Sequence, residues 1–344
     1  MRYTRTLTSL VALFAVGGCA TAPQWGLPAV TVTALAETEP VGTAEEDAAD
    51  DPAIWHNAAD PAASLIVATD KKAGLYVYGL DGSTRHFAPG GLLNNVDLVD
   101  LGTAGIIVVA SDRGNLEQAE LKLYRLDPVS ARLISLGSVP GGEGEAYGLC
   151  LWQNGVALHA FSVLKSGLIE EYRIELGSAP KSVPVLSRRV PSQPEGCVVD
   201  PRNGDFYVGE ENAGIWRFAA GSAAGILVAP TDGQQLVADV EGLALAPEGA
   251  DGGWLIASSQ GDNAYARYRL PDMEPAGRFR IAAGAFGSTE ETDGIELSTK
   301  PFGPKYPGGL FVAQDGVNAP SAQNFKLVSW ADIEAALAGT AAPE

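Results

Sequence analysis

Six segments of the chain each carry a polar, mostly acidic residue just before an apolar run, and in most of them a small residue stands between. The leading residues are separated by 46, 50, 48, 46 and 52 positions. They are Asp51, Asp97, Tyr147, Glu195, Glu241 and Asp293. Carboxylates brought together from several repeats are suited to a hard cation, because Ca²⁺ takes six to eight oxygen ligands.

A second polar cluster follows an apolar strand later in each repeat. In the first three repeats these clusters are basic, and in the last three they are acidic or amide-bearing. The basic residues are Lys71, Lys72, Arg113 and Lys165, and the others are Glu210, Glu211, Gln260 and Asp315. Asp239 precedes Glu241 in the fifth repeat. Lys and Arg hold phosphate oxygens through charge-assisted hydrogen bonds. We therefore expect a site with one cationic half and one carboxylate half, in which calcium and phosphate meet.

Covalent phosphatase chemistry has no support in the sequence. Of the histidines His56, His86 and His159, none lies in an Arg-His-Gly-x-Arg-x-Pro motif, and Cys197 is one residue too close to Arg202 for a Cys-x5-Arg loop. No Gly-rich nucleotide loop is present. A metal-activated water is the remaining route to phosphate ester hydrolysis.

The elements that must position these residues are short strands. Each repeat of about fifty residues holds several apolar or aromatic runs separated by Gly, Asp or Asn, which is typical of a four-stranded propeller blade. We predict an all-β, six-bladed β-propeller with the six leading residues around one mouth of its channel. The strand-like segment 29–33 is expected to close the ring by pairing in the last blade, and Trp330–Leu337 is the one expected helix.

The bulk composition excludes some partners. With 23 Lys+Arg and 42 Asp+Glu the formal net charge is −19, which disfavours nucleic acid. Residues 1–18 resemble an export signal whose lipobox ends at Cys19, so we expect a periplasmic, outer-membrane or secreted protein whose contact with a membrane is a lipid anchor. Residues 19–28 are expected to form a linker and residues 29–340 a single propeller domain, which we expect to be monomeric. Export permits a disulfide, but Cys150 and Cys197 are expected to be buried, unpaired thiols.

At the level of motifs the chain resembles the β-propeller phytases, also called alkaline or calcium-dependent 3-phytases. The resemblance runs from about residue 30 to 332. It rests on the segments Glu37–Val41, Asp47–Trp55, Lys71–Leu75, Leu93–Asp97, Tyr147-Gly148, Glu195-Gly196, Asp239–Leu243, Ala257–Gly261, Thr292–Ile295, Phe311–Gly316 and Gln323–Lys326. Asp70 and Leu164–Gly167 depart from the usual pattern.

This resemblance implies stepwise release of phosphate from calcium-phytate by a calcium-activated water. It implies active-site calcium ligands at Asp50, Tyr147, Glu195, Glu210, Asp239, Glu241 and Gln260, to which the acidic half adds Glu211. Structural calcium ligands are implied at Glu37, Asp51, Asn95, Asp97, Asp293 and Asp315. Lys71, Arg113 and Lys165 are expected to contact the scissile phosphate and Lys72 a neighbouring one. The catalytic set is then Lys71, Arg113, Tyr147, Lys165, Glu195 and Glu241.

Two other interpretations fit a propeller with an acidic mouth. One is a calcium-dependent lactonase, which uses a carboxylate and Asn around the metal and needs no set of four cations. The other is a surface lipoprotein that binds a ligand without catalysis. Phosphate release from phytate, measured with and without EDTA, separates them.

Overall fold

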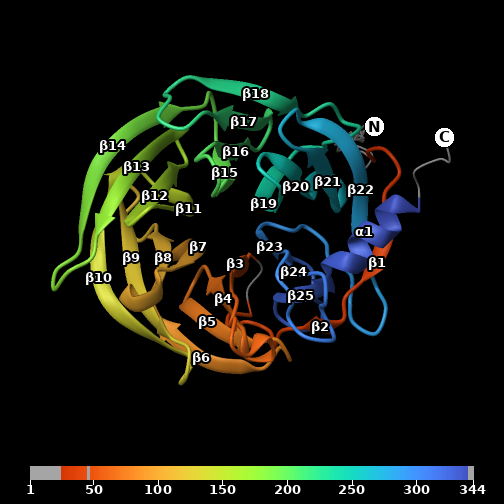
Figure 1. Cartoon of the computed structure of the whole chain (residues 1–344), viewed down its shortest axis with the longest axis horizontal. Coiled ribbons are helices and arrows are strands. Elements are labelled where there is room, and N and C mark those ends of the chain that lie inside the picture. Colours follow the sequence, from red (N-terminus) through yellow and green to blue (C-terminus); the bar gives the residue numbers. More distant parts are fainter. Residues whose placement is uncertain (1–24, 45–46, 340–344) are drawn as a thin grey trace, which may run out of the picture.

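The computed structural model describes residues 25–44 and 47–339. Six sheets surround a central channel, and the two ends of the described chain lie close together on one side of the ring (Figure 1). The predicted export signal, Cys19 and the first part of the predicted linker lie outside the described residues. The six-bladed β-propeller expected from the repeat is confirmed.

The consecutive strands of each blade pair antiparallel, and the first of them lies innermost. Blade one is β3 (Ala49–Trp55), β4 (Leu65–Asp70), β5 (Gly74–Gly79) and β6 (Thr84–Pro89). Blade two is β7 (Leu93–Asp100), β8 (Ile106–Asp112), β9 (Gln118–Asp127) and β10 (Arg132–Glu143). Blade three is β11 (Ala146–Asn154), β12 (Ala157–Leu164), β13 (Leu168–Glu175) and β14 (Lys181–Arg189).

The second half of the ring continues this order. Blade four is β15 (Pro194–Val199), β16 (Phe206–Glu210), β17 (Gly214–Phe218) and β18 (Gly225–Pro230). Blade five is β19 (Val240–Glu248), β20 (Gly252–Ser259), β21 (Ala264–Arg269) and β22 (Glu274–Ala282). Blade six contains β23 (Ile295–Ser298), β24 (Leu310–Asp315) and β25 (Asn324–Ser329).

The middle strands are apolar on both faces because each blade packs between two neighbours. In β8 the run from Ile106 to Ala110 is fully or almost fully buried, with alternate side chains facing blades one and three. Burial on both faces explains a continuous β-branched run where a half-exposed strand would alternate. Six apolar clusters fill the six spaces between adjacent blades, and together they form the core of the ring.

Closure of the ring differs from the expectation. The predicted strand forms as β1 (Val30–Thr33), but it pairs parallel with β22 on the outer edge of blade five. The outer strand of blade six is the next segment, β2 (Ala36–Glu37), which pairs with β25. The prediction chose the wrong blade because strand propensity does not specify which exposed edge a strand covers.

One α-helix ends the described chain. Helix α1 (Trp330–Ala338) begins after Ser329, whose Oγ accepts a hydrogen bond from Asp332 N. Its buried Trp330, Ile333 and Leu337 pack against blades five and six beside β1 (Figure 1). Short 3-10 helices lie at Pro61–Ala63, Gly102–Ala104 and Gln260–Asp262. Within the part of the chain that is described, no helix is both long and apolar enough to cross a membrane.

Candidate active site

Glycines allow the inner strands to bring the leading residues together. A Cβ on Gly148 would lie 1.9 Å from the Glu195 carbonyl oxygen, and one on Gly196 would lie 2.2 Å from that of Glu241. The same close approach joins blade five to blade six and blade six to blade one, where Gly242 N donates to Asp293 O and Gly294 N to Asp50 O. Only Gly fits such an approach between backbones. In these four blades the leading residue is followed by a glycine, and the close approach at that glycine sets the spacing of the leading residues around the mouth.

Three carboxylates from blades four and five form the densest acidic group. One oxygen each from Glu195, Glu211 and Glu241 lies within 4.8 Å of the others. Burial raises the pKa of Glu241 well above its usual range, and neighbouring Glu195 and Asp293 raise it further. Glu241 Oε2 is buried without a hydrogen-bond partner. Such a group is costly unless protons or a cation neutralise it.

Asp50 extends this group from blade one. Its side chain is fully buried, and neither carboxylate oxygen has a hydrogen-bond partner. Burial raises the pKa of Asp50 well above its usual range, with Lys71 opposing and Glu195 adding to the shift. A buried carboxylate whose two oxygens accept no hydrogen bond fits a hard cation, since calcium is bound by carboxylate oxygens.

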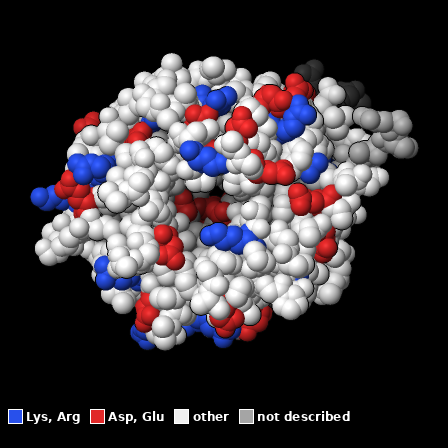
Figure 2. All heavy atoms as spheres, in the orientation of Figure 1, with Lys and Arg blue, Asp and Glu red and all other residues white. Residues whose placement is uncertain are grey.

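Lys71 lies among the carboxylates, which differs from a site divided into two halves. Its Nζ is 3.0 Å from Asp293 Oδ2 and 3.7 Å from Asp50 Oδ1, and it also pairs with Asp47. Burial opposes its charge, but Asp50 and Asp293 outweigh burial and hold the pKa of Lys71 above its ordinary value. Figure 2 shows acidic side chains at the floor of the central hollow and basic ones beside it. The expected division into a cationic half and a carboxylate half fails because the ring closes, which places blade six, with Asp293, beside blade one, with Lys71.

Asn94 joins the basic and acidic residues, and the sequence analysis did not select it. Its Oδ1 accepts a 2.6 Å hydrogen bond from Arg113 Nη1, and its Nδ2 donates to Glu195 Oε1 over 2.7 Å. Asn94 is completely buried. The available signal was its position in the Leu93–Asp97 segment, one residue before the selected Asn95.

Tyr147 and Lys165 come from blade three. Lys165 Nζ lies 5.0 Å from the centre of the Tyr147 ring, a cation–π distance. Burial raises the pKa of Tyr147, and the adjacent Glu195 and Glu241 raise it further. The phenol oxygen therefore faces the carboxylates, and it accepts a 3.3 Å hydrogen bond from Gln193 Nε2.

Several selected residues already have protein partners. Glu210 accepts hydrogen bonds from Ser192 and from Trp216 Nε1. Gln260 donates its backbone N–H to Asp239 O and its side-chain amide to Asp293 Oδ1. Of the neighbouring pair Glu210 and Glu211, only Glu211 lies in the carboxylate group.

Glu37 and Asp315 lie around a buried lysine, Lys326. Lys326 Nζ is 2.6 Å from Glu37 Oε2 and 3.0 Å from Asp315 Oδ2, and its side chain has no exposed area. Asn318 and Asn324 contribute amide oxygens to the same ammonium. The positive charge between these two carboxylates is thus supplied by the chain itself.

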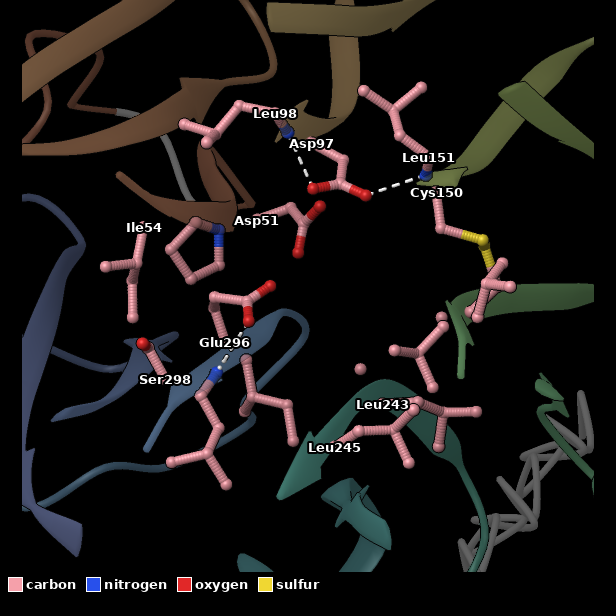
Figure 3. A pocket seen from close by; sticks show the side chains of 18 of the residues that line it. Asp51, Ile54, Asp97, Leu98, Cys150, Leu151, Leu243, Leu245, Glu296 and Ser298 are labelled. Carbon is pink, nitrogen blue, oxygen red and sulfur yellow. Dashed lines mark hydrogen bonds between the residues drawn. A yellow bond between two sulfur atoms is a disulfide. The ribbon is translucent and has the colours of Figure 1, made fainter. Parts of the chain in front are cut away.

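Asp51 and Asp97 point into the channel (Figure 3). With Glu296 they line a cavity of about 390 Å³. The other four leading residues do not line the same cavity, so the six do not form one simple ring. Burial raises the pKa of Asp97 to about 7, and it raises those of Asp51 and Glu296 well above their usual range. Asp51 accepts a hydrogen bond from Val96 N, beside the selected Asn95, whose side chain also contacts Asp51.

The cysteine prediction is wrong, because Cys150 and Cys197 form a disulfide at the wall of this cavity (Figure 3). They lie on β11 and β15, the inner strands of blades three and four, with their Cα atoms 5.8 Å apart. The sequence separation of 47 residues is close to one blade repeat, which brings the same blade position of adjacent blades together. That coincidence with the repeat was the missed signal.

Comparison with known proteins decides the family. The phytase family model matches residues 3–342. The chain belongs to the phytase family. A curated relative in the family, a 3-phytase of Bacillus subtilis (strain 168), is 39% identical over 324 residues, which cover 88% of this chain and 84% of the relative. The resemblance drawn from the motifs is thereby confirmed.

Proposed function

We propose that this chain releases inorganic phosphate from phytate in a calcium-dependent hydrolysis. The observation that carries the proposal is the buried group of Glu195, Glu211 and Glu241, which lies beside the cationic side chains of Lys71 and Lys165. A purely acidic site would repel a phosphate ester, and a purely basic one would need no carboxylates. The family relative named a 3-phytase supports the same substrate.

The metal proposal rests on the oxygen donors. Glu195, Glu211, Glu241 and Tyr147 would hold calcium together with Asp50, whose two oxygens are buried without hydrogen bonds. Calcium bound there would neutralise the carboxylates and lower the pKa of a water molecule so that it can attack phosphorus. Glu210 is the weaker candidate of the adjacent pair, because Ser192 and Trp216 already satisfy it.

The basic side chains would bind and orient the phosphate. Lys71 and Lys165 offer ammonium groups, and Arg113 offers the guanidinium nitrogens that do not contact Asn94. In the hydrolysis the oxygen of water bonds to phosphorus, the ester P–O bond breaks, and the departing alkoxide takes up one of the two protons of that water, leaving the alcohol and inorganic phosphate. Fixed cations around the phosphate would stabilise the charge that develops on its oxygens.

Phosphate release from phytate tests the proposal directly. We expect release that stops with EDTA and returns with added calcium. Glu241→Gln and Arg113→Lys should each lower kcat/KM at least 100-fold with an unchanged circular dichroism spectrum. Arg202→Lys is a matched control, since Arg202 pairs with Asp200 and blade-edge carbonyls away from the mouth. Lactone hydrolysis without phosphate release would support the lactonase interpretation. If both activities are absent, the result would support the ligand-binding lipoprotein.

We also propose that the chain is an exported monomer, anchored through a lipid on Cys19. The Cys150–Cys197 disulfide supports export, because such bonds persist in oxidising compartments and are rare in the cytosol. Radiolabelled fatty acid should enter the protein and be absent from Cys19→Ala. Equal labelling of that variant would contradict the anchor.

A further inference from the structure

One carboxylate lies across both neighbouring lysines of blade one. Asp47 Oδ1 pairs with Lys71 Nζ, and Asp47 Oδ2 lies 3.6 Å from Lys72 Nζ. Although partial burial opposes its charge, Lys71, Lys72 and Arg113 together hold the pKa of Asp47 below its usual range. Asp47 is therefore ionised at neutral pH, with both oxygens turned to cations that the proposed function assigns to phosphate.

Exposure separates Asp47 from the other partners of Lys71. The Asp50 and Asp293 side chains are 0% and 16% exposed, whereas that of Asp47 is 61% exposed. Lys72 is also accessible, at 37%. An incoming anion can displace an exposed carboxylate with little loss, because water solvates the carboxylate once it has left.

Hydrogen bonds hold the backbone on both sides of Asp47. Ala48 O accepts a 2.6 Å hydrogen bond from Lys71 N, and Ala48 N donates to Gln323 Oε1. On the other flank Thr43 N donates to Asp70 Oδ2. Asp47 itself has φ of 60°, in the left-handed region that disfavours residues other than glycine.

We propose that Asp47 is an internal competitor for the phosphate position at Lys71 and Lys72. The inference rests on the proposed function, because it takes these lysines as phosphate ligands. A carboxylate and a phosphate both present two anionic oxygens to a pair of ammonium groups. Asp47 occupies that position when no substrate is bound, so a phosphate group must displace it. This residue therefore sets how tightly the mouth holds phosphate, including the orthophosphate that the reaction releases.

The expected effect follows from the strength of an exposed ion pair. Removing the charge of Asp47 should tighten orthophosphate binding about two- to five-fold, the gain expected when a competing surface ion pair is lost. If Asp47 instead oriented the lysines for phosphate, its removal would weaken binding. The sign of the change distinguishes the two roles.

Calorimetric titration with orthophosphate in calcium-containing buffer provides the test. Asp47→Asn is compared with wild type and with Glu291→Gln, a control that removes another exposed charge from the adjoining groove, which is lined by Asp47 and Glu291. Glu291 is not an ion-pair partner of either lysine in the described part of the chain. Tighter binding by Asp47→Asn alone supports the inference.

Two results would overturn it. One is orthophosphate binding by Asp47→Asn that is unchanged or weaker than that of wild type, including binding too weak to detect in both. The other is equal tightening in Glu291→Gln, which would indicate a general effect of net charge. Phytate turnover by the wild type is measured separately, so failure of the proposed function appears as absent turnover whatever the binding results are.

Discussion

Asn94 Nδ2 donates a 2.7 Å hydrogen bond to Glu195 Oε1 and so links blade two to blade four at the mouth. Because Asn94 Oδ1 accepts from Arg113, the amide orientation is fixed by a cation on one side and a carboxylate on the other. A buried side chain with both ends satisfied in this way positions both partners.

Replacing Asn94 should therefore impair catalysis through its partners. Asn94→Ala leaves Arg113 Nη1 and Glu195 Oε1 without this buried partner, which costs about 1–3 kcal/mol. We expect kcat/KM for phytate to fall roughly 10- to 100-fold, in proportion to that energy. Asn94→Asp should weaken calcium binding more, because it adds a charge beside Glu195. Steady-state kinetics and calcium titrations would measure both, and wild-type values in Asn94→Ala would refute this role.

The disulfide should stabilise the ring between blades three and four. Cys150 and Cys197 close a loop across 47 residues of sequence separation. Loop-closure entropy for a loop of this length gives about 4 kcal/mol, and measured disulfides commonly give 2–4 kcal/mol. The Cys150→Ser/Cys197→Ser double variant should lose that free energy of unfolding in urea titrations. Reductant should lower the stability of wild type and leave the variant unchanged; an equal response of both would argue against the bond.

Lys326 should matter to stability more than any exposed ion pair. Lys326→Met removes the only cation with a direct ion pair to the buried carboxylate of Asp315 among the described residues, and also the partner of Glu37. Breaking a buried pair from one side costs about 3–5 kcal/mol. Arg85→Met, which breaks the exposed pair with Asp81, is the control and should cost no more than about 1 kcal/mol. Urea titrations at pH 7 compare them, and similar losses in both would contradict the prediction.

Calcium should stabilise the protein more as pH rises. Burial raises the pKa of Asp293 to about 6 and that of Asp97 to about 7. A carboxyl with a raised pKa favours the fold below its unfolded pKa of about 4, and this stability is lost as pH rises through the folded value. The metal-free protein should thus lose stability between about pH 4 and 7, where the carboxylates become able to bind calcium.

Differential scanning fluorimetry with calcium and with EDTA measures this effect. The difference in Tm between the two conditions should be small at pH 5 and should grow steadily to pH 8. Magnesium at the same concentration controls for ionic strength, because its demand for octahedral geometry suits this site less well. A Tm difference that does not change with pH would mean that calcium does not bind to carboxyls whose pKa values are raised by burial, Asp50 and Glu241 among them.

The repeat in the sequence was enough to predict the six blades and to select several of the residues that the structure brings together around Lys71. Strand propensity, an interval near fifty residues and the acidic residue followed by glycine are local features, and local features survive in a single sequence. They located Glu195, Glu241, Lys71 and Arg113, and the motifs gave the family.

Contacts between blades could be decided only by the tertiary structure. Four features join residues from different parts of the chain. They are the pairing of β1 with blade five, the disulfide, the ion pairs of Lys326 with Glu37 and Asp315, and the hydrogen bonds of Asn94 to Arg113 and Glu195. Each depends on which surfaces meet when the ring closes, and a linear pattern does not contain that geometry. Closure also brought Lys71 beside Asp293, so that charges assigned to opposite halves of the sequence became ion-pair partners at one mouth.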